Sequence, residues 1–147
     1  MISDFPCRRQ RGSYDCLPTA VGAVLEWHQI GYTPANLSEW CGVQPGGCDW
    51  YDALDGLKAE GFSLHEPQDF EEICDFVKDL KEPLPIIATV VLDARQYGSD
   101  HAVVIVGILP EVIVFMDPTT GELRQCSQIE FCKGWQIAGN RAVAILG

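Results

Sequence analysis

The chain has 147 residues, of which 47% are hydrophobic, and this balance predicts one globular domain over residues 1–147. Ten basic residues stand against 21 acidic ones, and the net charge of −11 repels phosphate backbones, so we expect no nucleic-acid partner. No stretch reaches the roughly 20 apolar residues of a membrane-spanning helix, and the N-terminus lacks the apolar core of an export signal. We therefore expect a cytoplasmic protein without a membrane span.

Helical patterns fill the first half of the chain. From Leu17, apolar residues recur at intervals of three and four, which predicts a helix that Gly31 ends. Cys16 then lies at the N-terminus of this helix. Capping residues and apolar stripes predict three further helices, over residues 34–41, over residues 49–61, and from Asp69 to the prolines at 83 and 85.

The second half changes to the pattern of strands. Short runs rich in valine and isoleucine predict buried strands at residues 86–92, 102–108, 112–116 and 141–146. Between the last two, Ser127 and Glu130 form a capping box that predicts a short helix before Trp135. Helices followed by strands with short turns indicate an α+β fold in which an N-terminal helical subdomain packs on a C-terminal antiparallel sheet.

Cys16 and Gln10 are placed as a nucleophile and an oxyanion donor would be. A thiol at a helix N-terminus lies in a field that favours the thiolate, which is the nucleophilic form of cysteine. Gln10 precedes Cys16 across a short loop, and its amide can donate to an oxyanion beside the backbone N–H of the nucleophile. The alternative for this pair alone is a buried thiol and a surface glutamine.

His101 and Asp117 complete a possible triad. His101 begins the strongest predicted strand, so its imidazole can project from the rim of the sheet as a general base. Asp117 follows the next strand, and two adjacent antiparallel strands of this length bring the two side chains together. The carboxylate can then orient one ring nitrogen and stabilise the imidazolium. Each residue taken alone also has a structural interpretation. His101 could be a solvated or buried histidine, and Asp117 could belong to an Asp-Pro turn.

The other cysteines do not have the spacing of a metal site. The seven cysteines form an odd set that we expect to be mostly thiols in a reducing compartment. Cys41 with Cys48, and Cys126 with Cys132, are too far apart to match the close pairs of structural zinc sites, so we expect no metal and no cofactor.

Three motifs follow one another in the order and spacing of a known family: Gln10-x5-Cys16-x-Pro18-x-Ala20, His101-Ala-Val-Val-Ile-Val-Gly107 and Asp117-Pro118-x-x-Gly121. This arrangement resembles the bacteriocin-processing, double-glycine-leader peptidases among the papain-like cysteine peptidases. The resemblance implies a papain-like fold and a thiol protease that hydrolyses a peptide or protein substrate. It implies Cys16 as the nucleophile, His101 as the general base and acid, Asp117 as the orienting carboxylate, and Gln10 as the oxyanion donor.

Two departures from the family keep other functions open. Leu17 follows the nucleophile where the family usually has glycine, and we expect it to add bulk beside the scissile bond. The family is often the N-terminal part of an exporter, whereas this chain ends at Gly147 without a membrane or nucleotide-binding segment. A silent module that binds a leader or partner peptide, and an effector-like deamidase or isopeptidase, are therefore the alternatives to cleavage after Gly-Gly. The sequence indicates no particular oligomeric state.

Overall fold

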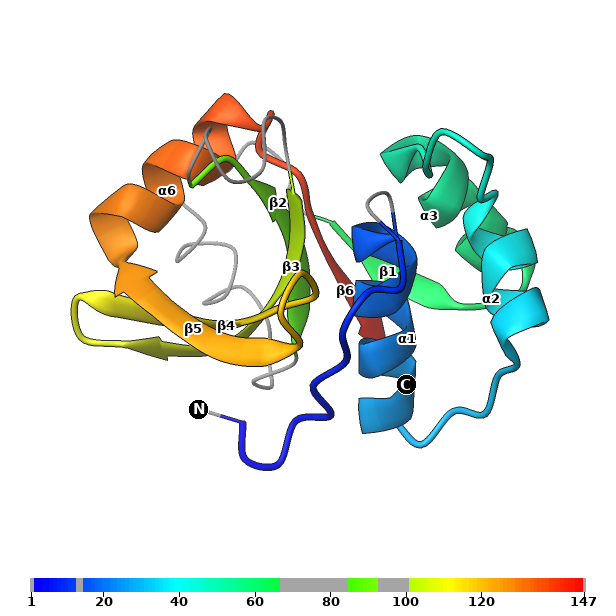
Figure 1. Cartoon of the computed structure of the whole chain (residues 1–147), viewed down its shortest axis with the longest axis horizontal. Coiled ribbons are helices and arrows are strands. Elements are labelled where there is room, and N and C mark those ends of the chain that lie inside the picture. Colours follow the sequence, from blue (N-terminus) through cyan, green and yellow to red (C-terminus); the bar gives the residue numbers. More distant parts are fainter. Residues whose placement is uncertain (1, 13–14, 67–84, 93–100, 147) are drawn as a thin grey trace.

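The computed structural model describes residues 2–12, 15–66, 85–92 and 101–146. Within these ranges, an antiparallel sheet has the strand order β1-β6-β2-β3-β4-β5, with helices on both of its faces (Figure 1). The elements are α1 (Cys16–Trp27), α2 (Pro34–Cys41), α3 (Trp50–Ala59), β1 (Ser63–His65), β2 (Ile86–Val90), β3 (His101–Leu109), β4 (Val112–Asp117), β5 (Glu122–Ser127), α6 (Gln128–Ile137) and β6 (Ala142–Leu146). None of the helices in these ranges has the length and apolar character needed to cross a membrane.

The central strands are buried on both faces because the sheet lies between two layers of helices. Along β3, Ala102, Val104 and Val106 join the core on the side of α1, α2 and α3. Val103 and Ile105 alternate with them and join a second core beneath α6. Burial on both faces explains why these strands appear in the sequence as continuous apolar runs. The predicted α+β architecture is confirmed.

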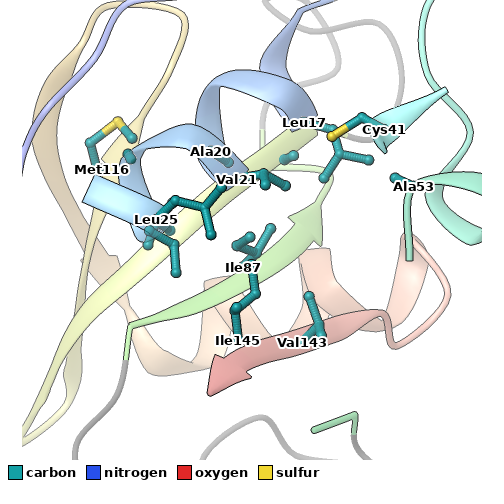
Figure 2. Close-up of a cluster of buried hydrophobic side chains, with 14 of the residues drawn as sticks. Leu17, Ala20, Val21, Leu25, Cys41, Ala53, Ile87, Met116, Val143 and Ile145 are labelled. Carbon is teal, nitrogen blue, oxygen red and sulfur yellow. The ribbon is translucent and has the colours of Figure 1, made fainter. Parts of the chain in front are cut away.

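The apolar stripe of α1 fixes this helix against the sheet. Val21 and Leu25 point from α1 toward Ile87 of β2, and Leu17 lies beside Cys41 at the end of α2 (Figure 2). All five side chains are buried. Because α1 also packs on β3, the N-terminus of the helix has a fixed position relative to the start of that strand.

Three predicted helix starts are confirmed by their caps. The side chains of Thr33, Asp49 and Ser127 each accept a hydrogen bond from the backbone N–H three residues later, at 3.0, 3.0 and 3.1 Å. Each satisfies a donor that the first helical turn leaves without a partner. Local sequence chemistry therefore sets where α2, α3 and α6 begin.

Two predicted helix ends were wrong. The first helix ends at Trp27 rather than Gly31, because Gln29 takes the left-handed conformation with φ 59° and turns the chain earlier. The helix after Ser127 does not stop before Trp135. It continues to Ile137, because the Trp135 ring is fully buried in the core beneath α6 and holds the last turn against the sheet.

The sequence analysis missed both edge strands. β1 pairs with β6, and β5 pairs with β4 along all six of its residues, from Glu122 to Ser127. Every residue of these two strands is exposed or half-buried, so neither shows the apolar run that revealed the central strands. The helix predicted from Asp69 lies outside the described residues.

Candidate functional site

Cys16 lies where the sequence predicted, as the first residue of α1. Asp15 precedes it as the N-cap residue but does not cap the helix with its side chain. Instead the Asp15 carboxylate accepts a hydrogen bond from Gly12 N at 3.0 Å, and Asp15 N donates to Gly12 O at 3.3 Å. The two contacts close the loop before the helix. Cys16 is half-buried, so its thiol keeps access to solvent at the positive end of the helix.

Leu17 does not enlarge the surface beside the thiol. It is 6% exposed and belongs to the α1 stripe that packs into the core (Figure 2). The expectation that Leu17 adds bulk beside a scissile bond is therefore wrong. The signal was present in the sequence, because Leu17 shares its helix face with Val21.

The sheet brings His101 and Asp117 together, as the strand pattern predicted. His101 begins β3 and Asp117 ends β4, and the pairing of Val104 with Met116 places the ends of the two strands side by side. His101 Nε2 lies 2.8 Å from Asp117 Oδ1. The two side chains are 8% and 0% exposed, so this ion pair is shielded from solvent.

Two further residues hold this pair, and the sequence analysis named neither. Thr119 N donates to Asp117 Oδ1 at 2.9 Å, and Thr119 Oγ1 lies 2.8 Å from His101 Nε2. Arg124 Nη1 donates to Asp117 Oδ2 at 2.8 Å. The turn after Asp117 could have indicated the backbone contact, since aspartate commonly accepts from the N–H two residues later. Arg124 comes from β5, the polar edge strand that was missed.

The contacts of His101 orient its ring and set its charge. Nε2 faces Asp117 and Thr119, so Nδ1 is the ring nitrogen left for a further partner. Cys16 is near enough to the ring to contribute to the pKa of His101. Burial by itself lowers the pKa of His101, because it penalises the imidazolium. The hydrogen bonds and negative charges of Asp117 and Cys16 outweigh burial and raise the pKa to about 9. The imidazolium therefore predominates at neutral pH.

Gln10 lies beside the turn that follows Asp117. Its backbone N donates to Pro118 O at 2.7 Å, and its side-chain Nε2 donates to Gly12 O at 2.8 Å. Because the Gly12 carbonyl can only accept a hydrogen bond, the Gln10 amide must turn its nitrogen toward Gly12. The amide oxygen, Oε1, then points the other way. That Oε1 atom is buried and has no hydrogen-bond partner among the described residues. One of the two amide N–H groups is engaged by Gly12, and the second can serve a ligand.

Cys41 and Cys48 form a second pair of interacting thiols. The Cys48 thiol donates to Cys41 O at 3.0 Å. A hydrogen bond with Cys41 lowers the pKa of Cys48, and the same bond, together with burial, raises the pKa of Cys41. Among the described residues, no three histidine, cysteine or acidic side chains gather as a metal site would require.

Comparisons with known proteins agree with this arrangement. A model of the Peptidase C39 family matches residues 4–140. The peptidase domain of Streptococcus ComA, a bifunctional ABC transporter involved in a quorum-sensing pathway, superposes with a TM-score of 0.75 at 20% identity, covering 96% of this chain and 97% of that one. No curated protein sequence matches the chain.

Two further solved structures share the fold. A double-glycine-motif protease from an AMS/PCAT transporter, solved with its leader peptide, has a TM-score of 0.69 at 17% identity, covering 98% of this chain and 95% of that one. The peptidase domain of Streptococcus mutans ComA has a TM-score of 0.63 at 16% identity, with 97% and 100% covered. At these identities the likenesses establish the papain-like peptidase fold.

Proposed function

Because the chain belongs to the Peptidase C39 family and is thus a papain-like cysteine peptidase, we propose that it cleaves a peptide bond through a triad of Cys16, His101 and Asp117. The observation that carries this proposal is the position of His101. Its ring contacts Asp117 through Nε2 and lies near enough to Cys16 for the thiol to raise the pKa of the ring. Thiol proteolysis needs a base placed between a carboxylate and a thiol in this way.

Each of the three triad residues has its own role in the proposed reaction. The Cys16 thiolate attacks the carbonyl carbon of the scissile bond and forms a tetrahedral intermediate. The His101 imidazolium then gives its proton to the leaving amine, and the acyl group stays on sulfur as a thioester. Neutral His101 next takes a proton from water, whose oxygen displaces the sulfur and releases the acid. Asp117 keeps the His101 ring in its orientation and stabilises the positive charge of the imidazolium throughout.

Gln10 supplies the remaining part of the proposed mechanism. The intermediate carries negative charge on the former carbonyl oxygen, and preorganised N–H donors stabilise it. The backbone N–H of Cys16, at the start of α1, is one donor, and the second N–H of the Gln10 amide is the other. The bonds from Gln10 to Gly12 and Pro118 hold the amide in place before substrate arrives.

The proposed substrate is a peptide whose leader ends in Gly-Gly. The double-glycine-motif protease that shares this fold was solved with its leader peptide, which supports an extended peptide as the ligand here. A glycine has no Cβ, so it lets the carbonyl approach the half-buried thiol closely. We further propose that the chain acts as one domain over residues 1–147 in the cytoplasm, where a reducing environment keeps Cys16 a thiol.

The test follows products by mass spectrometry from a panel of Gly-Gly and bulky-junction peptides. The parent should cut after the second glycine and reject bulky residues there, whereas Cys16→Ala should yield no product. Cys48→Ala is the matched control, because Cys48 is also a half-buried thiol and its hydrogen bond with Cys41 lowers its pKa. It should cleave like the parent. Equal binding by parent and Cys16→Ala, with no product from either, would contradict the peptidase and favour a peptide-binding module.

A further inference from the structure

A pocket of about 380 Å³ lies along the outer side of α1, between the N-terminal arm and α2. One face of α1 forms its floor, from Asp15, next to the proposed nucleophile, to Glu26 in the last turn. The arm contributes three arginines, and α2 contributes Pro34, Leu37 and Ser38. The pocket therefore begins at the residue before Cys16 and continues along the helix toward its C-terminal end.

The charge of this pocket opposes that of the whole chain. Arg8, Arg9 and Arg11 line it, which is three of the ten basic residues in a chain of net charge −11. Arg8 pairs with Glu26 at 2.9 Å and is neutralised. Arg9 and Arg11 form no ion pair with any described residue and are exposed. Asp15 and Glu26 also line the pocket, so three positive and two negative side chains leave its lining with a net charge of +1. Arg9 and Arg11 are the two guanidinium groups of the lining that could pair with an acidic ligand.

The arm that carries these arginines has a fixed position. The contact between Gln10 N and Pro118 O ties it to the turn after β4. On the same turn, Gly121 has φ 71°, and a Cβ there would lie 3.0 Å from the backbone nitrogen of Arg9. Only a residue without a side chain admits the arm so closely. The guanidinium groups of Arg9 and Arg11 are therefore presented from a braced backbone.

The far end of the pocket is also shaped by specific contacts. Tyr32 OH donates to Glu26 Oε1 at 3.2 Å, and Glu26 in turn holds Arg8. Gly22 makes room for this tyrosine, because a Cβ there would lie 2.7 Å from the Tyr32 hydroxyl. The network of Arg8, Glu26 and Tyr32 closes the pocket at the end remote from Cys16.

We propose that this pocket binds an acidic side chain of the peptide substrate, held by Arg9 and Arg11. The inference rests on the proposed function, since it assigns the ligand to the peptide that reaches Cys16. The floor from Asp15 to Glu26 is roughly 16 Å long at about 1.5 Å per helical residue. An extended peptide covers that length in about five residues. The glutamate or aspartate thus lies within about five residues of the scissile bond.

Binding to Cys16→Ala tests the proposal independently of cleavage. Fluorescence anisotropy would measure the Kd of Gly-Gly peptides that carry a single glutamate at successive positions on either side of the junction, each compared with its glutamine twin. At one or two neighbouring positions, glutamate should bind about fivefold more tightly than glutamine, the size of a solvent-exposed ion pair. The preference should weaken as salt is added.

Variants in the same Cys16→Ala background assign that preference to the pocket. Changing Arg9→Gln and Arg11→Gln together should bring the ratio of the two Kd values close to one. Lys133→Gln removes the same charge from the exposed surface of α6 and should leave the ratio unchanged. Equal Kd values for glutamate and glutamine peptides at every position, or a preference that survives loss of both arginines, would overturn the inference. Absence of cleavage by the parent would instead count against the proposed function.

Discussion

The two halves of the site are built differently. On the sheet side, the Asp117 carboxylate is fully buried and meets His101, Thr119 and Arg124. On the helix side, Cys16 and Gln10 are half-buried, and the Gln10 oxygen has no hydrogen-bond partner among the described residues. The sheet therefore holds its charged pair ready before substrate binds. On the helix side, one N–H of the Gln10 amide is engaged by Gly12, and the second is available as a donor.

The largest expected effect on stability comes from removing Asp117. Asp117→Ala leaves the His101 imidazolium buried without its carboxylate, and breaking such a pair typically costs about 3 kcal/mol or more of unfolding free energy. Turnover should fall by roughly 10² to 10⁴, yet less than in Cys16→Ala, because nucleophile and base remain. Urea unfolding and peptide cleavage measure the two losses.

Glu122→Ala is the matched control for that measurement. Glu122 pairs in register with Asp117 across β4 and β5 but is exposed. Its loss should change the unfolding free energy by no more than about 0.5 kcal/mol. Equal destabilisation by the two substitutions would show that the Asp117 network is not the rigid half of the site.

The same contrast explains what the sequence could predict. Cys16, His101 and Asp117 are each placed by strong local patterns: a helix stripe, an apolar strand and the turn between two paired strands. Arg124 could not be found, because β5 shows no apolar alternation. Nothing in the sequence therefore indicated that the chain returns along β4 and brings Arg124 to the Asp117 carboxylate. The pocket beside α1 was also hidden, because net charge does not reveal that arginines gather where the chain folds back on the helix.

The helix side is tested by Gln10→Ala. An oxyanion donor acts chiefly in the transition state, so kcat should fall by roughly a hundredfold while KM and the melting temperature change little. Gln44→Ala, at an exposed glutamine in the turn before α3, is the control and should retain the parent kcat. A Gln10→Ala variant with the parent kcat would remove Gln10 from the mechanism.

The last expected effect is the pH dependence that His101 gives to stability. The pKa of His101 is about 9 in the fold and about 6.5 in an unfolded chain, so folding favours the protonated ring. Its stabilisation is fully present below pH 6.5 and is lost as pH rises toward 9, by about 3 kcal/mol in total. Urea unfolding of the reduced protein from pH 6 to 9 should show this decline in the parent. Because His101→Gln lacks the titrating ring, the difference between the two proteins cancels the contribution of other groups, including Cys48. A decline of the same size in both proteins would mean that the buried pair does not hold the extra proton.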